Sequence, residues 1–346
     1  MKLEFRRLDL RLAHTWKIAR TQGMNSFKVV TVRLADPDGT TGLGEAAPVA
    51  RYNESPETVA AFLQKVDSRK LCFDDLAGSM NYLDALSPAD WSAKCAINMA
   101  LLDGAAKRAR KPVYDFLGLG FREKYHVTSF TIGIDRPEII RRKVLAAESY
   151  PVLKMKVGVP QDKVNLRVLR EVAPTKPVRV DANEGWRAKE QALEMIEWLA
   201  KDGHVQFVEQ PMPASTPLKD RVWLKRRSPL PIFADESYHR AEDAEEAAEC
   251  FDGVNVKLVK AGGITDGLEA LQAARKLGLR TMLGCMIETS ILTSAAAHLA
   301  ERCDFLDLDG HLLITNDPYV GMTAEKGILS FAHAPEKFGL RVNARR

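Results

Sequence analysis

Charged side chains follow a series of short apolar runs in the second half of the chain. These residues are Lys156, Asp181, Glu209, Asp235 and Lys257, at steps of 25, 28, 26 and 22 residues. A strand, a helix and two loops need about that length, so the spacing predicts successive β/α units with a charged residue at the end of each strand. The active site of a (β/α)₈ barrel is built from those strand ends, so we expect these side chains to meet.

Three of these residues are carboxylates on consecutive strands, which predicts a metal site. Neighbouring strands lie about 4.8 Å apart, and three negative charges at that spacing repel one another unless a cation neutralises them. Oxygen ligands without histidine or cysteine favour Mg²⁺ or Mn²⁺ over zinc. The candidate ligands are Asp181, Glu209 and Asp235. The alternative for each acid is a cap on the following helix.

Lysines are expected on both sides of this site. Lys154 and Lys156 are two residues apart on one strand, so their side chains point to the same face. Lys257 ends the sixth strand, which lies across the barrel from the second. A partly desolvated lysine beside a divalent ion can act as a base. The alternative is that the lysines only pair with the carboxylates.

A second acidic pair, Asp307 and Asp309, closes the eighth strand. With a period of two, both carboxylates can face the pocket away from the metal ligands. Such a pair suits a cationic group on a substrate. A turn or capping role is the alternative.

The elements that position these residues indicate an α/β fold with more than one part. Residues 29–34 and 40–45 read as a hairpin, Ser55-Pro56 as a helix start, and residues 90–110 as an alanine-rich helix. From about residue 125, strands and helices alternate. Strands are expected at 127–132, 280–284 and 303–307, which complete eight. A late strand at 328–331 is expected to return to the first domain.

Composition excludes several classes of protein. The chain has 346 residues and a formal net charge of +4, with no basic run interleaved with aromatics, so we expect no nucleic-acid partner. It has no apolar stretch of about 18 residues, so we expect no membrane span, and the N-terminus lacks a signal-peptide core. Five scattered cysteines without C-x-x-C spacing are typical of reduced thiols. These features favour a cytoplasmic protein.

The ordered motifs resemble the enolase superfamily and, within it, the muconate-lactonising subgroup. They are Lys154-Met155-Lys156, Asp181-Ala182-Asn183, Glu209-Gln210-Pro211, Asp235-Glu236-Ser237 and the segment 255–264. The resemblance implies a (β/α) barrel of the enolase type at 121–315. It also implies an N-terminal α+β capping domain at 1–120, completed by the segment 316–346.

Asp307-Leu308-Asp309 and the segment 284–289 are similar to dipeptide epimerases of this subgroup. This resemblance implies 1,1-proton transfer at the α-carbon of the C-terminal residue of a dipeptide, through an enediolate. The implied substrate is L-Ala-D/L-Glu or a related dipeptide, with a role in peptidoglycan recycling. A homo-oligomer is expected.

The resemblance also implies roles for individual residues. Asp181, Glu209 and Asp235 would bind one Mg²⁺ per subunit, with Mn²⁺ as a substitute. The remaining roles would be α-proton transfer by Lys156 and Lys257, charge neutralisation by Lys154, ammonium binding by Asp307 and Asp309, and further substrate contacts by Met286, Ile287 and Glu288. Either Arg20 or Arg51 would bind an acidic side chain of the substrate.

Three other readings stay open. N-acylamino acid racemase, o-succinylbenzoate synthase and muconate cycloisomerase share the metal ligands and lysines, but their substrates lack the ammonium that Asp307 and Asp309 would bind. A barrel lyase or aldolase would use one Schiff-base lysine and usually no acidic triad. A non-catalytic binding barrel would not need the lysines.

Overall fold

The structure, a computed structural model, describes residues 1–345. Eight parallel strands form one sheet in which each strand pairs with the next along the chain. A parallel bridge between Thr128 and Leu306 joins the two edges, so the sheet closes almost completely into the expected barrel. The strands are β4 (Phe130–Ile132), β5 (Leu153–Lys156), β6 (Val178–Asp181), β7 (Val205–Glu209), β8 (Ile232–Ala234), β9 (Gly253–Val256), β10 (Arg280–Gly284) and β11 (Phe305–Asp307).

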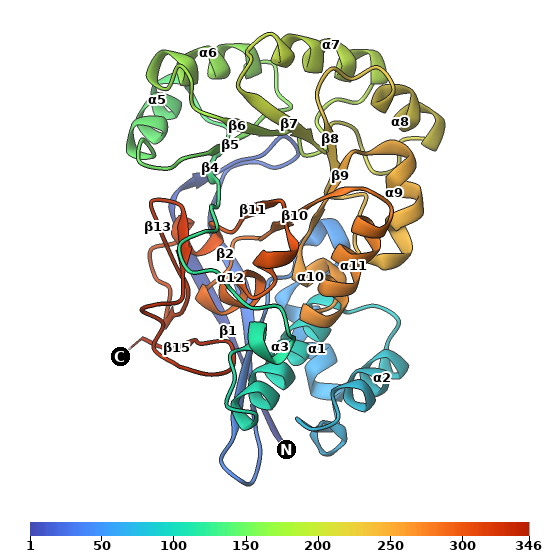
Figure 1. Ribbon diagram of the computed structural model, residues 1–346, viewed down its shortest axis with the longest axis vertical. Helices are drawn as coiled ribbons and strands as arrows, with labels where there is room; N and C mark the ends of the chain where they lie inside the picture. The colour runs from blue at the N-terminus through green and yellow to red at the C-terminus, as the bar shows by residue number, and fades with distance from the viewer. Residues whose placement is uncertain (346) are drawn as a thin grey trace.

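Helices cover the outside of this barrel, and α5 to α9 arch around one side of it (Figure 1). They form because apolar residues recur at helical spacing, as Leu166 and Leu169 do on the buried face of α6. The α-helices are α5 (Pro137–Ala146), α6 (Asp162–Val172), α7 (Lys189–Ala200), α8 (Leu218–Lys225), α9 (Ala244–Cys250), α10 (Leu258–Ala261), α11 (Ile264–Lys276) and α12 (Ser290–Ala297), and the 3₁₀ helices are η3 (Ala241–Asp243), η4 (Ala300–Arg302) and η5 (Gly310–Leu313).

Along the barrel strands, charged side chains that meet one another alternate with apolar side chains that pack in the core. On β5, Met155 packs into the apolar core, whereas the ammonium groups of Lys154 and Lys156 meet carboxylates of other strands. Two residues before Glu209 lies Phe207, which belongs to a small separate apolar cluster with Phe233, and the two rings stack at 4.2 Å between centroids. Because strand residues two apart share a face, this cluster packs the barrel interior beneath the charged residues.

The N-terminal domain consists of an antiparallel sheet, β1 to β3, covered by helices. Helix α3 packs so closely on β3 that a Cβ at Gly42 or Gly44 would collide with the α3 backbone carbonyls, which explains glycine there. As expected, Ser55 caps α1 and Pro56 begins it. The elements are β1 (Lys2–Trp16), β2 (Met24–Ala35), β3 (Thr41–Ala46), η1 (Ala50–Tyr52), α1 (Pro56–Lys65), η2 (Ser68–Lys70), α2 (Leu76–Leu86), α3 (Trp91–Arg108) and α4 (Val113–Phe116).

The loop between β1 and β2, residues 17–23, reaches the mouth of the barrel. Its Lys17 carbonyl accepts a hydrogen bond from Ile134 N just after β4 (3.0 Å), and its Ala19 packs against Gly158, which follows β5. In Figure 1 the blue strands rise from the N-terminal domain to the green strands of the barrel. The N-terminal domain therefore contributes side chains above the strand ends.

The C-terminal segment contacts both parts. Leu340 N donates to Asp103 on α3 of the N-terminal domain (2.7 Å), and Met322 N donates to Ser294 Oγ on α12 of the barrel (2.9 Å). Its strands are β12 (Tyr319–Val320), β13 (Thr323–Glu325), β14 (Ile328–Ser330) and β15 (Asn343–Ala344). No helix within residues 1–345 is both long and apolar enough to cross a membrane.

The structure corrects several expected boundaries. The first and eighth barrel strands are shorter than predicted, beginning at Phe130 and Phe305. Lys257 is not within the sixth strand but directly follows β9. The late strand at 328–331 is observed as β14. It pairs with β13 and with Val127, which lies just before β4, rather than with the N-terminal sheet. A three-residue strand carries too little pattern to specify its partner.

Candidate active site

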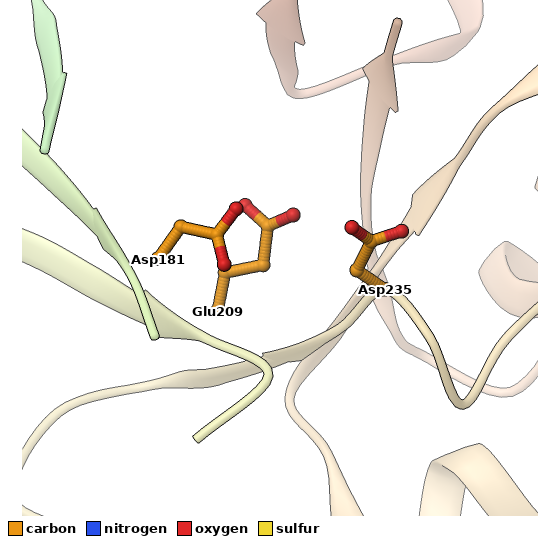
Figure 2. A group of neighbouring side chains, drawn as sticks. All are labelled: Asp181, Glu209 and Asp235. Carbon is orange, nitrogen blue, oxygen red and sulfur yellow. The ribbon is translucent and has the colours of Figure 1, made fainter. Parts of the chain in front are cut away.

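The three candidate metal ligands converge at the carboxyl ends of neighbouring strands. Asp181 ends β6, Glu209 ends β7 and Asp235 directly follows β8. One carboxylate oxygen of each lies within 4.8 Å of those of the other two, and all three residues are buried (Figure 2). None of them occupies the N-cap of the helix that follows its strand. The capping alternative therefore does not describe these acids.

The donor set fits a hard divalent cation. Glu209 Oε1 accepts a hydrogen bond from Asn255 Nδ2 (2.8 Å), whereas the buried Glu209 Oε2 has no hydrogen-bond partner among residues 1–345. Lys154 Nζ lies 2.8 Å from that oxygen, but the contact lacks hydrogen-bond geometry. A buried carboxylate oxygen without a hydrogen bond is costly, and it points to a ligand that the oxygen would hold. Three oxygen ligands suit Mg²⁺.

The lysines contact these acids from opposite sides of the barrel. Lys156 Nζ contacts Asp181 Oδ2 (2.6 Å), and Lys257 Nζ contacts Asp235 Oδ2 (2.7 Å). Strand β5 carries the first lysine and β9 precedes the second, and these strands are four places apart in the eight-stranded sheet. The two ammonium groups thus flank the carboxylates across the barrel. Lys154 adds a third, 3.1 Å from Asp181 Oδ2.

These charges determine how the acids ionise. Burial disfavours the charged form of Asp181, but the charges of Lys156 and Lys154 together outweigh it and keep the pKa of Asp181 below its ordinary value. For Asp235, burial is outweighed in the same way by Lys257, Lys260 and Lys154 together, which hold its pKa well below its usual range. For Glu209, burial and then the charge of Asp181 raise the pKa to about 7. Of the three acids, Glu209 therefore depends most on an added cation.

One buried lysine at this site was not predicted. Lys260 Nζ bonds to Asp235 Oδ1 (2.6 Å), to Tyr238 O (2.9 Å) and to the Asp235 carbonyl, and its side chain is fully buried. It therefore holds the oxygen of Asp235 that Lys257 does not contact. The only sequence signal is its position three residues after Lys257, which places it one turn into α10.

The acidic pair at the last strand divides into two different environments. Asp307 accepts hydrogen bonds from Ser129 Oγ (2.7 Å) and Lys154 Nζ (2.7 Å). Asp309 is not on the strand; it precedes η5, and its Oδ2 accepts a bond from Thr131 N (2.6 Å). Within residues 1–345, Asp309 forms no ion pair, although only 2% of the residue is exposed. Its carboxylate does not cap η5.

The segment after β10 lies beside this pair. Met286 N donates to Glu288 Oε2 (3.0 Å), while the buried Glu288 Oε1 has no hydrogen-bond partner in the part of the chain that the structure describes. Burial, and then the charge of Glu45, raise the pKa of Glu288 well above its ordinary value. Ile287 is buried in the core. Thr289, which follows Glu288, donates its backbone N–H to Glu45 of the N-terminal domain (2.9 Å).

Both candidate arginines lie over the metal end of the site, and both are paired. Arg20 contacts Glu236 Oε1 in a close ion pair and also Asn183 O (3.3 Å). Arg51 binds Glu184 through two bonds, of 2.9 and 2.8 Å. The structure thus joins Lys154, Lys156, Lys257, the three acids and Asp307 in one contact network, and Arg20 borders it through Glu236. It also supplies partners that the sequence did not reveal.

Comparison with known proteins agrees with this geometry. The family model described as "Mandelate racemase / muconate lactonizing enzyme, N-terminal domain" matches residues 5–118, and the one described as "Enolase C-terminal domain-like" matches residues 140–326. The chain is 64% identical to an L-Ala-D/L-amino acid epimerase of Pedosphaera parvula, over 100% of both chains. It is 39% identical to an L-Ala-D/L-Glu epimerase of Bacteroides thetaiotaomicron, covering 97% of this chain and 86% of the other.

A solved structure with the same architecture is the substrate-liganded L-Ala-D/L-Glu epimerase from Bacillus subtilis, with a TM-score of 0.92, 27% identity and coverage of 100% and 99%. Another is the dipeptide epimerase from Cytophaga hutchinsonii complexed with Mg and D-Ala-L-Val, with a TM-score of 0.92, 28% identity and coverage of 99% and 95%. This chain therefore belongs to the mandelate racemase and muconate-lactonizing branch of the enolase superfamily, and it is an isomerase of the racemase and epimerase kind.

Proposed function

We propose that the chain is a Mg²⁺-dependent dipeptide epimerase that inverts the α-carbon of the C-terminal residue by 1,1-proton transfer. The observation that carries this proposal is the placement of Lys156 and Lys257 on opposite sides of one buried carboxylate cluster. Inversion requires a base on one face of the α-carbon and an acid on the other. The relatives named as an L-Ala-D/L-amino acid epimerase and as a dipeptide epimerase support the same reaction.

Asp181, Glu209 and Asp235 would hold the Mg²⁺. When bound, the ion would supply positive charge beside the substrate carboxylate, where charge develops as the α-proton leaves. It would also compensate the carboxylates that now hold Lys156 and Lys257, so those ammonium groups would be free to face the α-carbon. One lysine, in its neutral form, then takes the proton, and the other returns a proton to the opposite face.

Lys154 would stabilise the enediolate without transferring a proton. Burial disfavours its charge, but Asp307 and the nearby acids outweigh burial and hold its pKa well above the ordinary value. Lys154 therefore stays protonated, and its side chain is only 1% exposed. A preorganised charge that meets new negative charge stabilises the transition state more than the ground state.

Asp309 would bind the ammonium of the dipeptide. It is a buried carboxylate that forms no ion pair in the described part of the chain, and a buried charge without a partner is unfavourable. A cationic group on the substrate would supply that partner. Asp307, already paired with Lys154, would serve chiefly to hold that lysine, with the ammonium as a further contact.

We also propose a separate role for each of three segments of the chain. Residues 121–315 would form the catalytic barrel, residues 1–120 would cover its mouth through the loop 17–23, and residues 316–346 would bind the two together. The hydrogen bonds that Ile134 N of the barrel donates to Lys17 O, that Leu340 N donates to Asp103, and that Met322 N donates to Ser294 of the barrel support this division.

An exchange experiment tests the proposed function. The enzyme, loaded with Mg²⁺, is incubated in D₂O with a library of L-Ala-L-X dipeptides, and deuterium at the α-carbon is followed by mass spectrometry. Exchange and inversion at the C-terminal residue are expected. If no dipeptide exchanges while N-acylated amino acids do, the N-acylamino acid racemase alternative replaces this proposal.

A further inference from the structure

One buried arginine lies inside the barrel beneath the charged residues of the site. Arg179 is on β6, two residues before the candidate metal ligand Asp181, and only 4% of it is exposed. Since strand residues two apart share a face, its side chain enters the barrel interior one layer below the carboxylates. Its guanidinium lies 5.0 Å from the ring centroid of Phe305 and 5.8 Å from that of Phe207, distances at which aromatic faces attract a cation.

This guanidinium is held by neutral groups. Within residues 1–345 Arg179 forms no ion pair, and its hydrogen bonds go to Leu306 O (2.5 Å), Gln206 Oε1 (3.1 Å) and Ser129 Oγ (3.5 Å). Burial lowers the pKa of Arg179 to about 10, so the group stays charged at neutral pH. A buried charge without an ion pair is unfavourable, and a residue that breaks such a rule is typical of a functional position.

The hydrogen bonds of Arg179 reach the part of the barrel where the sheet is least continuous. Strands β4 and β11 are the two ends of the sheet order, and they meet through the bridge between Thr128 and Leu306. Leu306 O accepts hydrogen bonds from both Ser129 N (3.2 Å) and Arg179 Nη1 (2.5 Å). Arg179 thus extends from β6 to the junction of β4 and β11 and supplies a donor there.

The same junction holds the acid that pairs with Lys154. Asp307 directly follows Leu306, and its Oδ1 accepts a hydrogen bond from Ser129 Oγ (2.7 Å). Its other oxygen, Oδ2, accepts one from Lys154 Nζ (2.7 Å). Arg179 therefore contacts both the residue before Asp307 and the hydroxyl group that orients the Asp307 carboxylate. A shift of this junction would move that carboxylate, and with it the ammonium group of Lys154.

Resting on the proposed function, we propose that Arg179 is a positioning residue: it fixes Asp307 through Leu306 O and Ser129, and Asp307 in turn fixes Lys154 beside the enediolate. Arg179 lies beneath the carboxylates, so we expect no contact between it and the substrate. Because the enediolate forms only as the α-proton leaves, loss of this positioning should lower kcat and kcat/KM by the same factor and leave KM nearly unchanged.

The test is a double-mutant cycle on the Mg²⁺-loaded enzyme, with kcat and KM measured for the L-Ala-L-X dipeptide that the wild-type enzyme uses best. Arg179→Met should lower kcat about 10- to 100-fold, the scale on which a group misplaced by about 1 Å affects a rate. In an Asp307→Ala background the same substitution should lower kcat less than about threefold, because the carboxylate that transmits the effect is absent. Ser129→Ala should likewise lower kcat in the wild-type background and not in Asp307→Ala.

The matched control is Arg221→Met, which removes another buried arginine. Arg221 is on α8, outside the barrel, and bonds to Thr216 O (2.9 Å) and Glu246 Oε1 (2.8 Å). This variant should keep the kcat of the wild-type enzyme.

A wild-type kcat in Arg179→Met overturns the inference. So does a loss of equal size in the wild-type and Asp307→Ala backgrounds, which is the result that a merely structural role predicts. If Arg179→Met does not fold, the same two outcomes for Ser129→Ala decide the inference. If the wild-type enzyme exchanges the α-proton of no L-Ala-L-X dipeptide, the proposed function fails and the inference falls with it, whereas a failed cycle in an active enzyme removes only the inference.

Discussion

Asp309 offers the sharpest test of the dipeptide assignment. Replacing it with asparagine keeps an acceptor for Thr131 N but removes the buried negative charge. A hydrogen bond to a charged group contributes about 1.5–3 kcal/mol, so kcat/KM for a free dipeptide should fall about 10- to 150-fold. Acetylating the amino group of the substrate should cost the wild-type enzyme a similar factor. For the Asp309→Asn enzyme, acetylating the substrate should lower kcat/KM only slightly, because the carboxylate charge that the ammonium would meet is already absent.

The pH dependence gives the same test a second readout. Burial, and then the charge of Asp307, raise the pKa of Asp309 to about 6. The carboxylate is therefore protonated, and cannot pair with an ammonium, below that pH. For the wild-type enzyme, kcat/KM with free dipeptides should decrease as the pH falls through about 6, and Asp309→Asn should lack this step.

The assay is deuterium exchange at the α-carbon, with Mg²⁺ affinity measured in parallel by calorimetry. The matched control is Asp304→Asn, which removes a charge just before β11, where Asp304 contacts Arg275 and Thr281 N. That variant should keep the preference for the free dipeptide. The reasoning is refuted if the wild-type enzyme turns over the acetylated dipeptide as well as the free one.

Three further results are expected. Removal of metal by EDTA should abolish activity and Mg²⁺ should restore it, while Glu209→Gln should lose most Mg²⁺ binding in calorimetry; full activity in a metal-free preparation would contradict the ligand assignment. Lys156→Ala and Lys257→Ala should each abolish epimerisation, although one of them can still exchange the α-proton of a single stereoisomer; substantial racemisation by either variant would exclude the two-base mechanism. Burial raises the pKa of Glu45 to about 7 from an ordinary value of 4.5, so the folded state binds more protons between these values and its stability should decrease by up to about 3 kcal/mol as the pH rises through that window. In urea unfolding, the free energy of unfolding should decrease less steeply with rising pH for Glu45→Gln than for the wild-type protein. Equal slopes for the two proteins would disprove this assignment.

Local pattern was enough to predict the barrel and its charged mouth. A β/α unit has a characteristic length and strand side chains alternate with a period of two, so the spacing from Lys156 to Lys257 placed five side chains at one end of a barrel. The hairpin of the N-terminal domain and the start of α1 at Ser55 follow from equally local signals. Short strands such as β14 carry too little of this pattern to identify a partner.

The partners of these residues were decided by the tertiary structure. Arg20 meets Glu236 from 216 residues away, and Thr131 meets Asp309 from 178 residues away, so no local period reports either contact. Lys260, in α10, reaches Asp235 at the end of β8, 25 residues earlier in the chain. The sequence determined which charges gather at the carboxyl ends of the barrel strands, because strand geometry is local. Which of those charges remain unpaired, and therefore available to a ligand, depends on distant segments packing together and excluding water.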